Sequence, residues 1–303
     1  MSERQAYDVV ILGTGPAGLQ AAIHAARKKV SVLVLGRESK SSLFHAHVEN
    51  FCCLFEIKGD EMLRLGRQQA KNFGTHFRSE DVLSIQSQDG HFILEMEGGD
   101  RIDALSIIIA TGTHRTRLGV KGEKEFLGKG VSYCVDCDGN FFRGEKVAVV
   151  GDESAAVDGA LTLAEIADEV HLISKEIKAA EPLKARLQAS SVVVHTGAQV
   201  DVIHGEQQVG GLSLKDGTRL PLSGVFIELG AKGLMQLAGF LGVQLDADLK
   251  YIAVDRRQAT NLPGIYAAGD ICGPPWQMAK AVGEGCVAGI EAANHAKKVT
   301  RQT

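Results

Sequence analysis

The chain has 303 residues, of which 45% are hydrophobic and 23% charged, as is typical of a globular protein with a full core. Its formal net charge of −4 gives no sequence-wide attraction to nucleic acid or anionic lipid. No apolar run reaches the ~18 residues of a membrane helix, and the charged start MSERQAYDVV indicates no secretory signal, so we expect a cytoplasmic location.

The first predicted element is a strand over residues 7–12 (YDVVIL), followed by the turn GTGPAG and a helix over residues 19–27. The apolar run is short, β-branched and closed by glycine, which favours a strand over a helix. Pro16 suits the first turn of the helix that follows. A second strand over residues 30–35 completes a strand–helix–strand unit.

The turn carries the spacing Gly13-x-Gly15-x-x-Gly18. Three glycines so spaced allow a tight turn, a close approach of a pyrophosphate and close packing of helix on strand. Because the spacing alone is weakly specific, the prediction of a dinucleotide site depends on the strand–helix context. Arg37 and Glu38 follow the second strand, where an acid can bind a ribose hydroxyl. A glycine-rich turn that binds nothing is the alternative.

The same pattern returns after a constant interval. Gly13 and Gly151 are 138 residues apart, and so are Val32 and Val170. A constant offset across strand, turn, helix and strand predicts two similarly wound units. We therefore expect an α/β fold with two Rossmann-like, doubly wound domains. Residues 1–112 and 240–303 form the first domain and residues 113–239 are inserted into it, with boundaries near Thr113 and Gly239.

One cysteine pair has redox spacing, Cys134-Val135-Asp136-Cys137, and Asp138 follows it. Such a pair can close a small disulfide, and Asp138 is a candidate acid and base for its protons. A zinc site needs four ligands, which the other cysteines do not offer at suitable spacing, so we expect no metal. A purely structural pair is the second alternative. The other four cysteines are Cys52, Cys53, Cys272 and Cys286.

Several longer segments carry a family resemblance. They are GTGPAGLQAAIHAAR near the start, VENF at residues 48–51, IIIATGTHR at 107–115, GVSYCVDCDGNFFRGEKVAVVG at 130–151 and GIYAAGDI at 264–271. In order, spacing and chemistry the chain resembles the low-molecular-weight thioredoxin reductases, which are FAD flavoproteins. The resemblance runs through nearly the whole length.

The resemblance implies that the first domain binds FAD and that the inserted domain carries the redox cysteines. It implies that Cys137 faces the flavin, that Cys134 attacks the disulfide of a thioredoxin-like partner, and that Asp138 is the acid–base group. It also implies a homodimer. The residues implied for FAD binding are Gly13, Gly15, Pro16, Ala17, Gly18, Arg37, Glu38, Leu43, Asn50, Thr111, Gly112, Gly269, Asp270, Gln277, Met278 and Ala279.

The inserted domain departs from the family pattern at two points. Its turn reads Gly151-Asp152-Glu153, so Glu153 stands where the first turn has Gly15. A carboxylate ~4 Å from a phosphate costs about 1 kcal/mol even in water. After the next strand the family shows a histidine–arginine–arginine run for the 2′-phosphate, whereas residues 174–178 here read SKEIK. These departures predict lost or very weak NADPH binding, with relaxed cofactor preference as the alternative.

The resulting hypothesis is a reductase of the pyridine-nucleotide-independent type, similar to the ferredoxin-dependent flavin thioredoxin reductases. Ferredoxins are usually acidic, and the lysines and arginine that could receive one are equally explained as ordinary solvated side chains. Two alternatives are a flavin-dependent dithiol oxidase that uses oxygen and a non-catalytic FAD-binding redox sensor. The basic residues in question are Lys121, Lys124, Lys129, Arg143 and Lys146.

Three further features have competing interpretations. Buried thiols are favoured over a regulatory role for Cys52 and Cys53. An ordinary loop is favoured over a metal site for residues 44–47 (FHAH). Trp276 either stacks near the flavin or packs beneath it.

Overall fold

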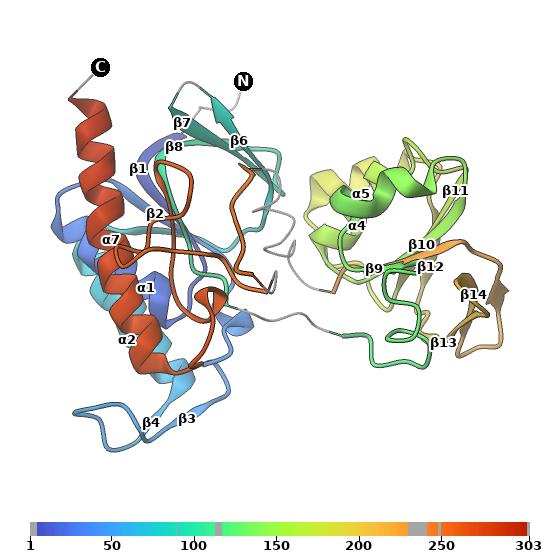
Figure 1. Ribbon diagram of the computed structural model, residues 1–303, viewed down its shortest axis with the longest axis horizontal. Coiled ribbons are helices and arrows are strands. Elements are labelled where there is room, and N and C mark those ends of the chain that lie inside the picture. The colour runs from blue at the N-terminus through green and yellow to red at the C-terminus, as the bar shows by residue number, and fades with distance from the viewer. Residues whose placement is uncertain (1–4, 89, 113–116, 230–240, 248–249, 302–303) are drawn as a thin grey trace. The chain divides into compact units, whose positions relative to one another are not determined.

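The computed structural model describes residues 5–88, 90–112, 117–229, 241–247 and 250–301 (Figure 1). The chain forms two compact units. The first comprises Met1–Met96, Asp100–His114 and Phe240–Thr303, and the second comprises Glu97–Gly99 and Arg115–Gly239. The predicted boundary residues Thr113 and Gly239 lie outside the described residues.

The first unit contains a seven-stranded sheet whose central strands are parallel. Its order is β5-β2-β1-β8-β7-β6, and β17 pairs in parallel with β8 near the end of that strand. The C-terminal part of the chain therefore rejoins the sheet that the N-terminal part begins. The strands are β1 (Gln5–Leu12), β2 (Val32–Leu35), β5 (His76–Arg78), β6 (Val82–Gln88), β7 (His91–Met96), β8 (Arg101–Ile109) and β17 (Ile265–Ala267).

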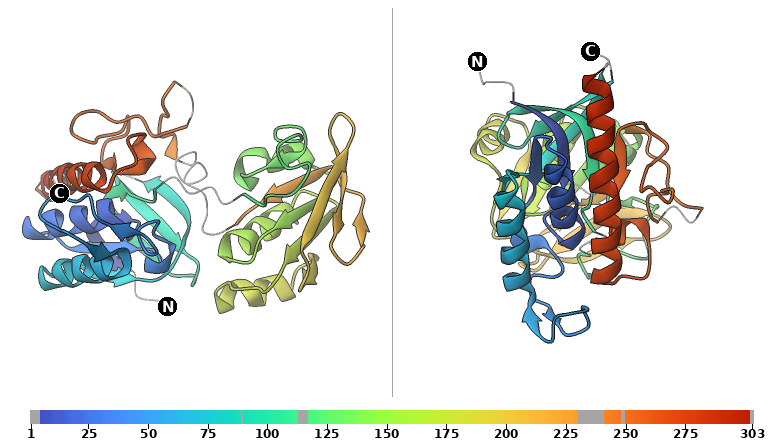
Figure 2. Two further views of the ribbon diagram at one scale, coloured as in Figure 1. Left: turned by 90° about the horizontal axis from the view of Figure 1, so that it is seen from below. Right: turned by 90° about the vertical axis from the view of Figure 1, so that its left-hand side faces the viewer.

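Three helices lie together on one side of this sheet, α1 (Pro16–Arg27), α2 (Gly59–Asn72) and α7 (Met278–Thr300) (Figure 2). Small residues let α1 and α7 approach closely. A Cβ at Gly285 would come within 2.2 Å of the carbonyl oxygen of Ala17, and one at Gly289 within 2.3 Å of that of Ala21. The last helix is thus fixed against the helix that opens the first glycine turn.

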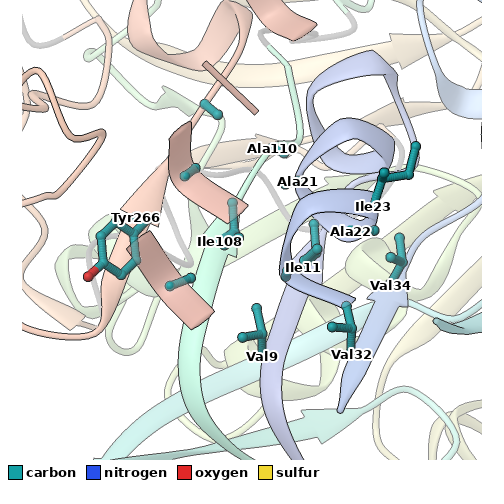
Figure 3. Close-up of a cluster of buried hydrophobic side chains, with 14 of the residues drawn as sticks. Val9, Ile11, Ala21, Ala22, Ile23, Val32, Val34, Ile108, Ala110 and Tyr266 are labelled. Atoms are coloured by element: carbon teal, nitrogen blue, oxygen red, sulfur yellow. The ribbon is translucent and has the colours of Figure 1, made fainter. Parts of the chain in front are cut away.

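The core of the first unit lies between the sheet and these helices, as Figure 3 shows. Val9 and Ile11 of β1 alternate toward the alanine-rich face of α1, and both are fully buried. β-Branched residues on the strands and alanines on the helix allow a short distance between the two layers. Short connecting elements are η1 (Glu38–Lys40), β3 (His47–Val48), β4 (Ile57–Lys58) and η3 (Asp270–Cys272).

The second unit contains a five-stranded parallel sheet of order β12-β11-β10-β16-β9 and a three-stranded antiparallel sheet of order β13-β14-β15. The helices are α3 (Val135–Asp138), α4 (Ser154–Leu163) and α5 (Glu181–Gln188), with η2 (Gly139–Phe142). The strands are β9 (Val131–Ser132), β10 (Lys146–Val150), β11 (Glu169–Ser174), β12 (Val193–Thr196), β13 (Val200–Gly205), β14 (Val209–Leu214), β15 (Arg219–Leu220) and β16 (Gly224–Ile227).

The strand register reproduces the interval found in the sequence. Val9 pairs with Val32 in the first unit, and Val147 pairs with Val170 in the second, so both members of the pair are shifted by 138 residues. The predicted α/β fold with two similarly wound parallel sheets is confirmed. No helix among the described residues is both long enough and apolar enough to cross a membrane.

Candidate active site

The first glycine turn connects β1 to α1, and its three glycines have different structural roles. A Cβ at Gly13 would lie 2.2 Å from the carbonyl oxygen of Ala110, and one at Gly18 would lie 2.0 Å from that of Gly13. Packing alone therefore requires these two glycines. A Cβ at Gly15 would meet only the hydroxyl oxygen of Ser41, at 3.4 Å, among the described residues. The absence of a side chain at Gly15 leaves room for a ligand beside the backbone.

The first turn of α1 offers an anion site at this opening. Gly15 is the N-cap and provides no side chain to accept the free N–H groups, and Pro16 occupies the first helical position. Ala17 is buried beside the turn. Free N–H groups and the positive end of the helix dipole favour a phosphate. The residues of the turn thus fit the pyrophosphate of FAD.

Arg37 and Glu38 follow β2, and each has a charged partner. Arg37 forms an ion pair with the buried carboxylate of Asp81, and Oε2 of Glu38 lies 3.6 Å from Nη1 of Arg67. Neither partner was predicted from the sequence, because the pairs join positions 44 and 29 residues apart. The two pairs fix the side chains that follow β2 at the edge where a ribose binds in such folds.

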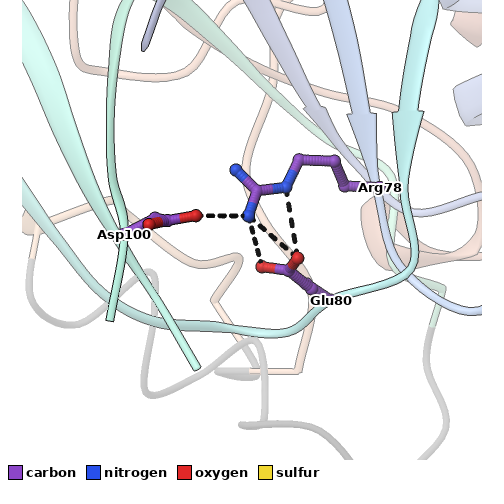
Figure 4. Close-up of polar contacts among 3 residues, drawn as sticks. All are labelled: Arg78, Glu80 and Asp100. Carbon is purple, nitrogen blue, oxygen red and sulfur yellow. Dashed lines mark hydrogen bonds and ion pairs between the residues drawn. The ribbon is translucent and has the colours of Figure 1, made fainter. Parts of the chain in front are cut away.

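A second charged cluster supports this edge (Figure 4). Nη2 of Arg78 donates to Oε2 of Glu80 at 2.8 Å and to Oδ2 of Asp100 at 2.7 Å. The carbonyl oxygen of Arg78 accepts the N–H of Gly36 at 3.2 Å. The cluster therefore holds the end of β5 in register with the end of β2.

The C-terminal segment meets the glycine turn at Gly269. A Cβ there would lie 3.0 Å from that of Ala17. The N–H of Gly269 donates to Glu284 at 2.8 Å, and Lys280 donates to both the Gly269 carbonyl and Glu284, at 3.0 Å each. This pair also escaped the sequence analysis, although its spacing of four residues on one helix could have indicated it. Asp270, the predicted ribityl ligand, begins η3 directly afterwards.

The remaining predicted FAD residues form a second group in the same unit. Nδ2 of Asn50 donates to Oε1 of Gln277, the N-cap of α7, at 3.2 Å. Leu43 is buried in a small cluster against which Met278 packs. Ala279 follows in α7, and Thr111 and Gly112 follow β8. Trp276 is 59% exposed in this chain, so packing beneath other residues is not its role here.

The redox pair lies at the start of α3, where Cys134 and Cys137 form a disulfide with their Cα atoms 5.3 Å apart. Cys134 is the N-cap, and its Sγ accepts the N–H of Cys137 at 3.1 Å. An N–H donor at a helix N-terminus stabilises a thiolate in this position. Cys134 is 9% exposed, whereas Cys137 is exposed.

Asp138 is tied to the same turn. Oδ2 of Asp138 accepts a 2.6 Å hydrogen bond from the hydroxyl of Ser132, and Oγ of Ser132 accepts the N–H of Cys134 at 3.0 Å. Ser132 thereby connects the predicted acid–base group to the backbone of the predicted nucleophile. The sequence analysis did not identify Ser132, which lies on β9 outside the C-x-x-C motif.

Two buried carboxylates support the redox turn. Glu228, 4% exposed, follows β16 and accepts the N–H of Val135 at 3.2 Å. Glu123, 2% exposed, accepts the hydroxyl of Tyr133 at 2.7 Å and the N–H groups of Leu118 and Gly119. Burial raises the pKa of Glu123, but these three hydrogen bonds and the charge of Arg117 together hold it below its usual value.

The other cysteines differ in accessibility. Burial, with the charge of Glu284, raises the pKa of Cys272 to about 12, so this thiol is unreactive near neutral pH. The prediction that Cys52 and Cys53 are buried is wrong, because both are exposed in a surface turn. The described residues contain no group of three or more histidine, cysteine, aspartate or glutamate side chains that could hold a metal ion.

The second glycine turn connects β10 to α4 and is lined by acids. A Cβ at Gly151 would lie 2.1 Å from the carbonyl oxygen of Glu228, so packing requires that glycine. Glu153 is the N-cap of α4, in the place that Gly15 has before α1. Oδ1 of Asp152 accepts the hydroxyl of Ser174 at 3.0 Å and the N–H of Lys175 at 2.8 Å. A carboxylate thus already occupies the donors that follow β11.

Comparison with known proteins agrees with this arrangement. Residues 7–285 match the family model described as pyridine nucleotide-disulphide oxidoreductase. The thioredoxin reductase of Listeria monocytogenes is 33% identical over 311 residues, which cover 98% of this chain and 96% of that protein.

Two solved structures are also similar. The atypical thioredoxin reductase TRi from Desulfovibrio vulgaris Hildenborough has a TM-score of 0.84 at 33% identity, covering 96% of this chain and 98% of that one. A ferredoxin-flavin thioredoxin reductase from Clostridium acetobutylicum has a TM-score of 0.70 at 31% identity, covering 99% of this chain and 100% of that one. The chain therefore belongs to the pyridine nucleotide-disulphide oxidoreductase family, as an enzyme of the thioredoxin reductase type.

Proposed function

We propose that this enzyme reduces the disulfide of thioredoxin or a similar dithiol protein through Cys134 and Cys137, with FAD as its cofactor and ferredoxin as its donor, and without NADPH. The observation that carries the proposal is the acidic turn before α4, where the carboxylate of Asp152 occupies the Lys175 N–H. In keeping with the resemblance, the proposal takes the enzyme to be a cytoplasmic homodimer.

FAD supplies two-electron reduction of the enzyme disulfide when it is bound. The first unit holds it through the opening at Gly15, the N–H groups at the start of α1, and the pair formed by Asn50 and Gln277. Lys280 and Glu284 keep the backbone of Gly269 in place beside Ala17. These contacts orient the group, while thiol chemistry takes place at the redox turn of the second unit.

Once reduced, the redox turn has an assigned order of attack. The Cys134 thiolate, stabilised by the Cys137 N–H, attacks a sulfur of the partner disulfide and releases the other partner sulfur. The Cys137 thiolate then attacks Sγ of Cys134, which expels the reduced partner and closes the enzyme disulfide again. Asp138, held by Ser132, delivers the proton that the departing thiolate requires.

An exposed aromatic side chain next to the redox turn suits a protein substrate. Phe141 is 82% exposed, and its neighbour Phe142 packs edge-on against Phe226 with ring centroids 5.2 Å apart. Packing of Phe142 fixes the backbone of η2, so Phe141 is presented on a rigid element. Exposed aromatic side chains on rigid elements are common anchors of protein interfaces.

The second glycine turn argues against a pyridine nucleotide. The position that must be small for a pyrophosphate is Glu153, at the N-terminus where the anion would lie. The N–H of Lys175, which lies where a 2′-phosphate is bound, already donates to Asp152. A nucleotide phosphate would have to displace one carboxylate and approach another, and lysines do not replace an arginine fork there.

The choice of ferredoxin draws on the Clostridium acetobutylicum structure, which is a ferredoxin-flavin thioredoxin reductase. Among the candidate basic residues, Lys121, Lys124 and Lys129 are exposed. Lys146 instead lies 2.5 Å from Glu169, which neutralises it as a docking charge. Three exposed lysines before β9 are thus the charges that remain for an acidic donor.

The test is anaerobic reduction of the purified holoenzyme, followed by the flavin absorbance. We expect no bleaching with NADPH or NADH and rapid bleaching with reduced ferredoxin. Glu153→Gly combined with Asp152→Ser should gain bleaching by NADPH, because these changes free the Lys175 N–H and remove two carboxylates. Glu165→Gln, at an exposed position of the same unit, removes a charge elsewhere and should gain none. Rapid bleaching of the wild-type enzyme by NADPH would overturn the proposal.

A further inference from the structure

Two adjacent thiols lie in the turn between β3 and β4. The Sγ atoms of Cys52 and Cys53 are 3.6 Å apart, and both residues are exposed. A disulfide bond is about 2.05 Å long, so closing one here needs a movement of roughly 1.5 Å. Rotation about the two side-chain bonds can supply a movement of this size.

The backbone of this turn favours glycine at the position of the second cysteine. Cys53 has a φ of 70°, in the left-handed region, and the N–H of Leu54 donates to the carbonyl oxygen of Phe51 at 3.0 Å. Cys53 is therefore the third residue of a four-residue turn, where glycine adopts a positive φ without strain. A cysteine in this conformation lowers stability, which points to a use for its sulfur.

The turn is open to solvent and close to predicted cofactor residues. Phe55 is 99% exposed, so small oxidants reach the neighbouring sulfurs freely. Asn50, two residues before Cys52, donates to Gln277 at the start of α7. The pair is thus accessible, and it adjoins the part of the first unit expected to hold the flavin.

We propose that Cys52 and Cys53 are a second redox site, in which a hydroperoxide closes a vicinal disulfide and a dithiol protein reopens it. One thiol takes an oxygen atom from the hydroperoxide, which leaves as the alcohol, or as water when hydrogen peroxide is used. The second thiol attacks the resulting sulfenic acid, forms the S–S bond and releases water. The pair loses two electrons and two protons in total.

Reduction of this disulfide is favourable for a geometric reason. Adjacent Cα atoms are about 3.8 Å apart, below the 4.4–6.8 Å usual for disulfides, so a vicinal disulfide is strained and easily reduced. A reduced dithiol protein, the product of the proposed function, returns the pair to two thiols as its own disulfide forms. Only this return step rests on the proposed function, and dithiothreitol replaces the protein in the test.

The test uses the full-length holoenzyme and the tryptic peptide 41–58, which contains Cys52 and Cys53 and no other cysteine. The reduced enzyme is treated with hydrogen peroxide, unfolded, alkylated with N-ethylmaleimide and digested. We expect the peptide to lose two hydrogens and take up no label, and dithiothreitol to restore double labelling. Two labelled thiols after peroxide, or separate sulfinic acids on both residues, would overturn the proposal.

Single variants separate ring closure from ordinary oxidation. In Cys53→Gly the turn receives the residue that its backbone favours, so the enzyme folds and Cys52 has no neighbour. With peroxide and dimedone, this variant should accumulate the trapped sulfenic acid at least ten-fold more than the wild type. Cys272→Ser, which changes a buried thiol, should behave as wild type at peptide 41–58. Equal trapping in the wild type and Cys53→Gly would show that the two sulfurs react independently.

Discussion

The hydroxyl of Ser132 donates a 2.6 Å hydrogen bond to Oδ2 of Asp138, and the same oxygen atom of Ser132 accepts the N–H of Cys134. One side chain thus sets the position of both the acid–base group and the nucleophile's backbone. Neither bond depends on the state of the disulfide itself. Ser132 is therefore expected to affect proton transfer while leaving the fold of α3 in place.

Replacing Ser132 with alanine should slow thioredoxin reduction about three- to ten-fold, the effect of losing one hydrogen bond. Ser132→Thr keeps the hydroxyl and should restore most of the rate. Asp138→Asn should slow the reaction by roughly 10²-fold, as removal of a general acid does. Steady-state rates with a thioredoxin, measured between pH 6 and 9, provide the check. A Ser132→Ala enzyme with an unchanged rate and pH profile would contradict this role.

The three glycines of the first turn should respond differently to alanine. Gly15→Ala should fold with a near-native melting temperature yet purify with much less flavin, because the new methyl group fills the space left for a ligand. Gly13→Ala should fail to fold, because its Cβ would meet the Ala110 carbonyl oxygen at 2.2 Å and its φ is 119°. Flavin-to-protein absorbance and thermal unfolding measure the two effects.

The control for this comparison is Gly283→Ala in α7. A Cβ at Gly283 would meet no described atom within 4 Å, and alanine favours a helix. This variant should keep its flavin and be equally or slightly more stable. Full flavin content in Gly15→Ala would remove the argument that Gly15 is kept for the pyrophosphate.

Much of this fold could be predicted because its signals are local. The strand–turn–helix around Gly13, its repeat at Gly151 and the C-x-x-C pair each lie within a few residues of sequence. The repeat interval even predicted which residues pair across the two sheets, as Val9 with Val32 and Val147 with Val170 show. Periodicity and turn chemistry determine such features without long-range information.

The supporting residues could not be predicted because their partners are distant in the chain. Arg37 finds Asp81 across 44 residues, and Val135 finds Glu228 across 93. Such pairs depend on which strands become neighbours, and a single sequence gives no measure of that. The exposure of Cys52 and Cys53 was missed for a related reason, because cysteine is usually buried and only the turn geometry places this pair at the surface.

Glu123 should make stability depend on pH in the acid range. Its pKa in the folded enzyme lies below its ordinary value, because the Tyr133 hydroxyl, two backbone N–H groups and Arg117 outweigh the effect of burial. The unfolded chain therefore binds the proton more tightly, and the stability from Glu123 is fully present above the unfolded pKa of about 4.3. That contribution is lost as the pH falls through the folded pKa.

Chemical denaturation between pH 3 and 7 should show this loss in the wild type and a flatter profile in Glu123→Gln. At pH 7 the variant should be about 1–3 kcal/mol less stable, since a buried charged acceptor with three donors is replaced. Glu125→Gln, at an exposed neighbouring position, is the matched control and should follow the wild type. Parallel profiles for all three proteins would exclude Glu123 as the source.

The two adjacent phenylalanines after the redox turn should separate docking from stability. Phe141 is 82% exposed, so Phe141→Ala should raise the KM for thioredoxin about ten-fold and leave the melting temperature unchanged. Phe142 packs on Phe226 and on the backbone at Gly224, so Phe142→Ala should lower stability by about 3 kcal/mol. Reduction of a small disulfide such as 5,5′-dithiobis(2-nitrobenzoate) should be unaffected in Phe141→Ala, because such a substrate needs no aromatic anchor. If the variant lost that small-molecule activity too, Phe141 would serve the redox turn itself rather than the contact with a protein partner.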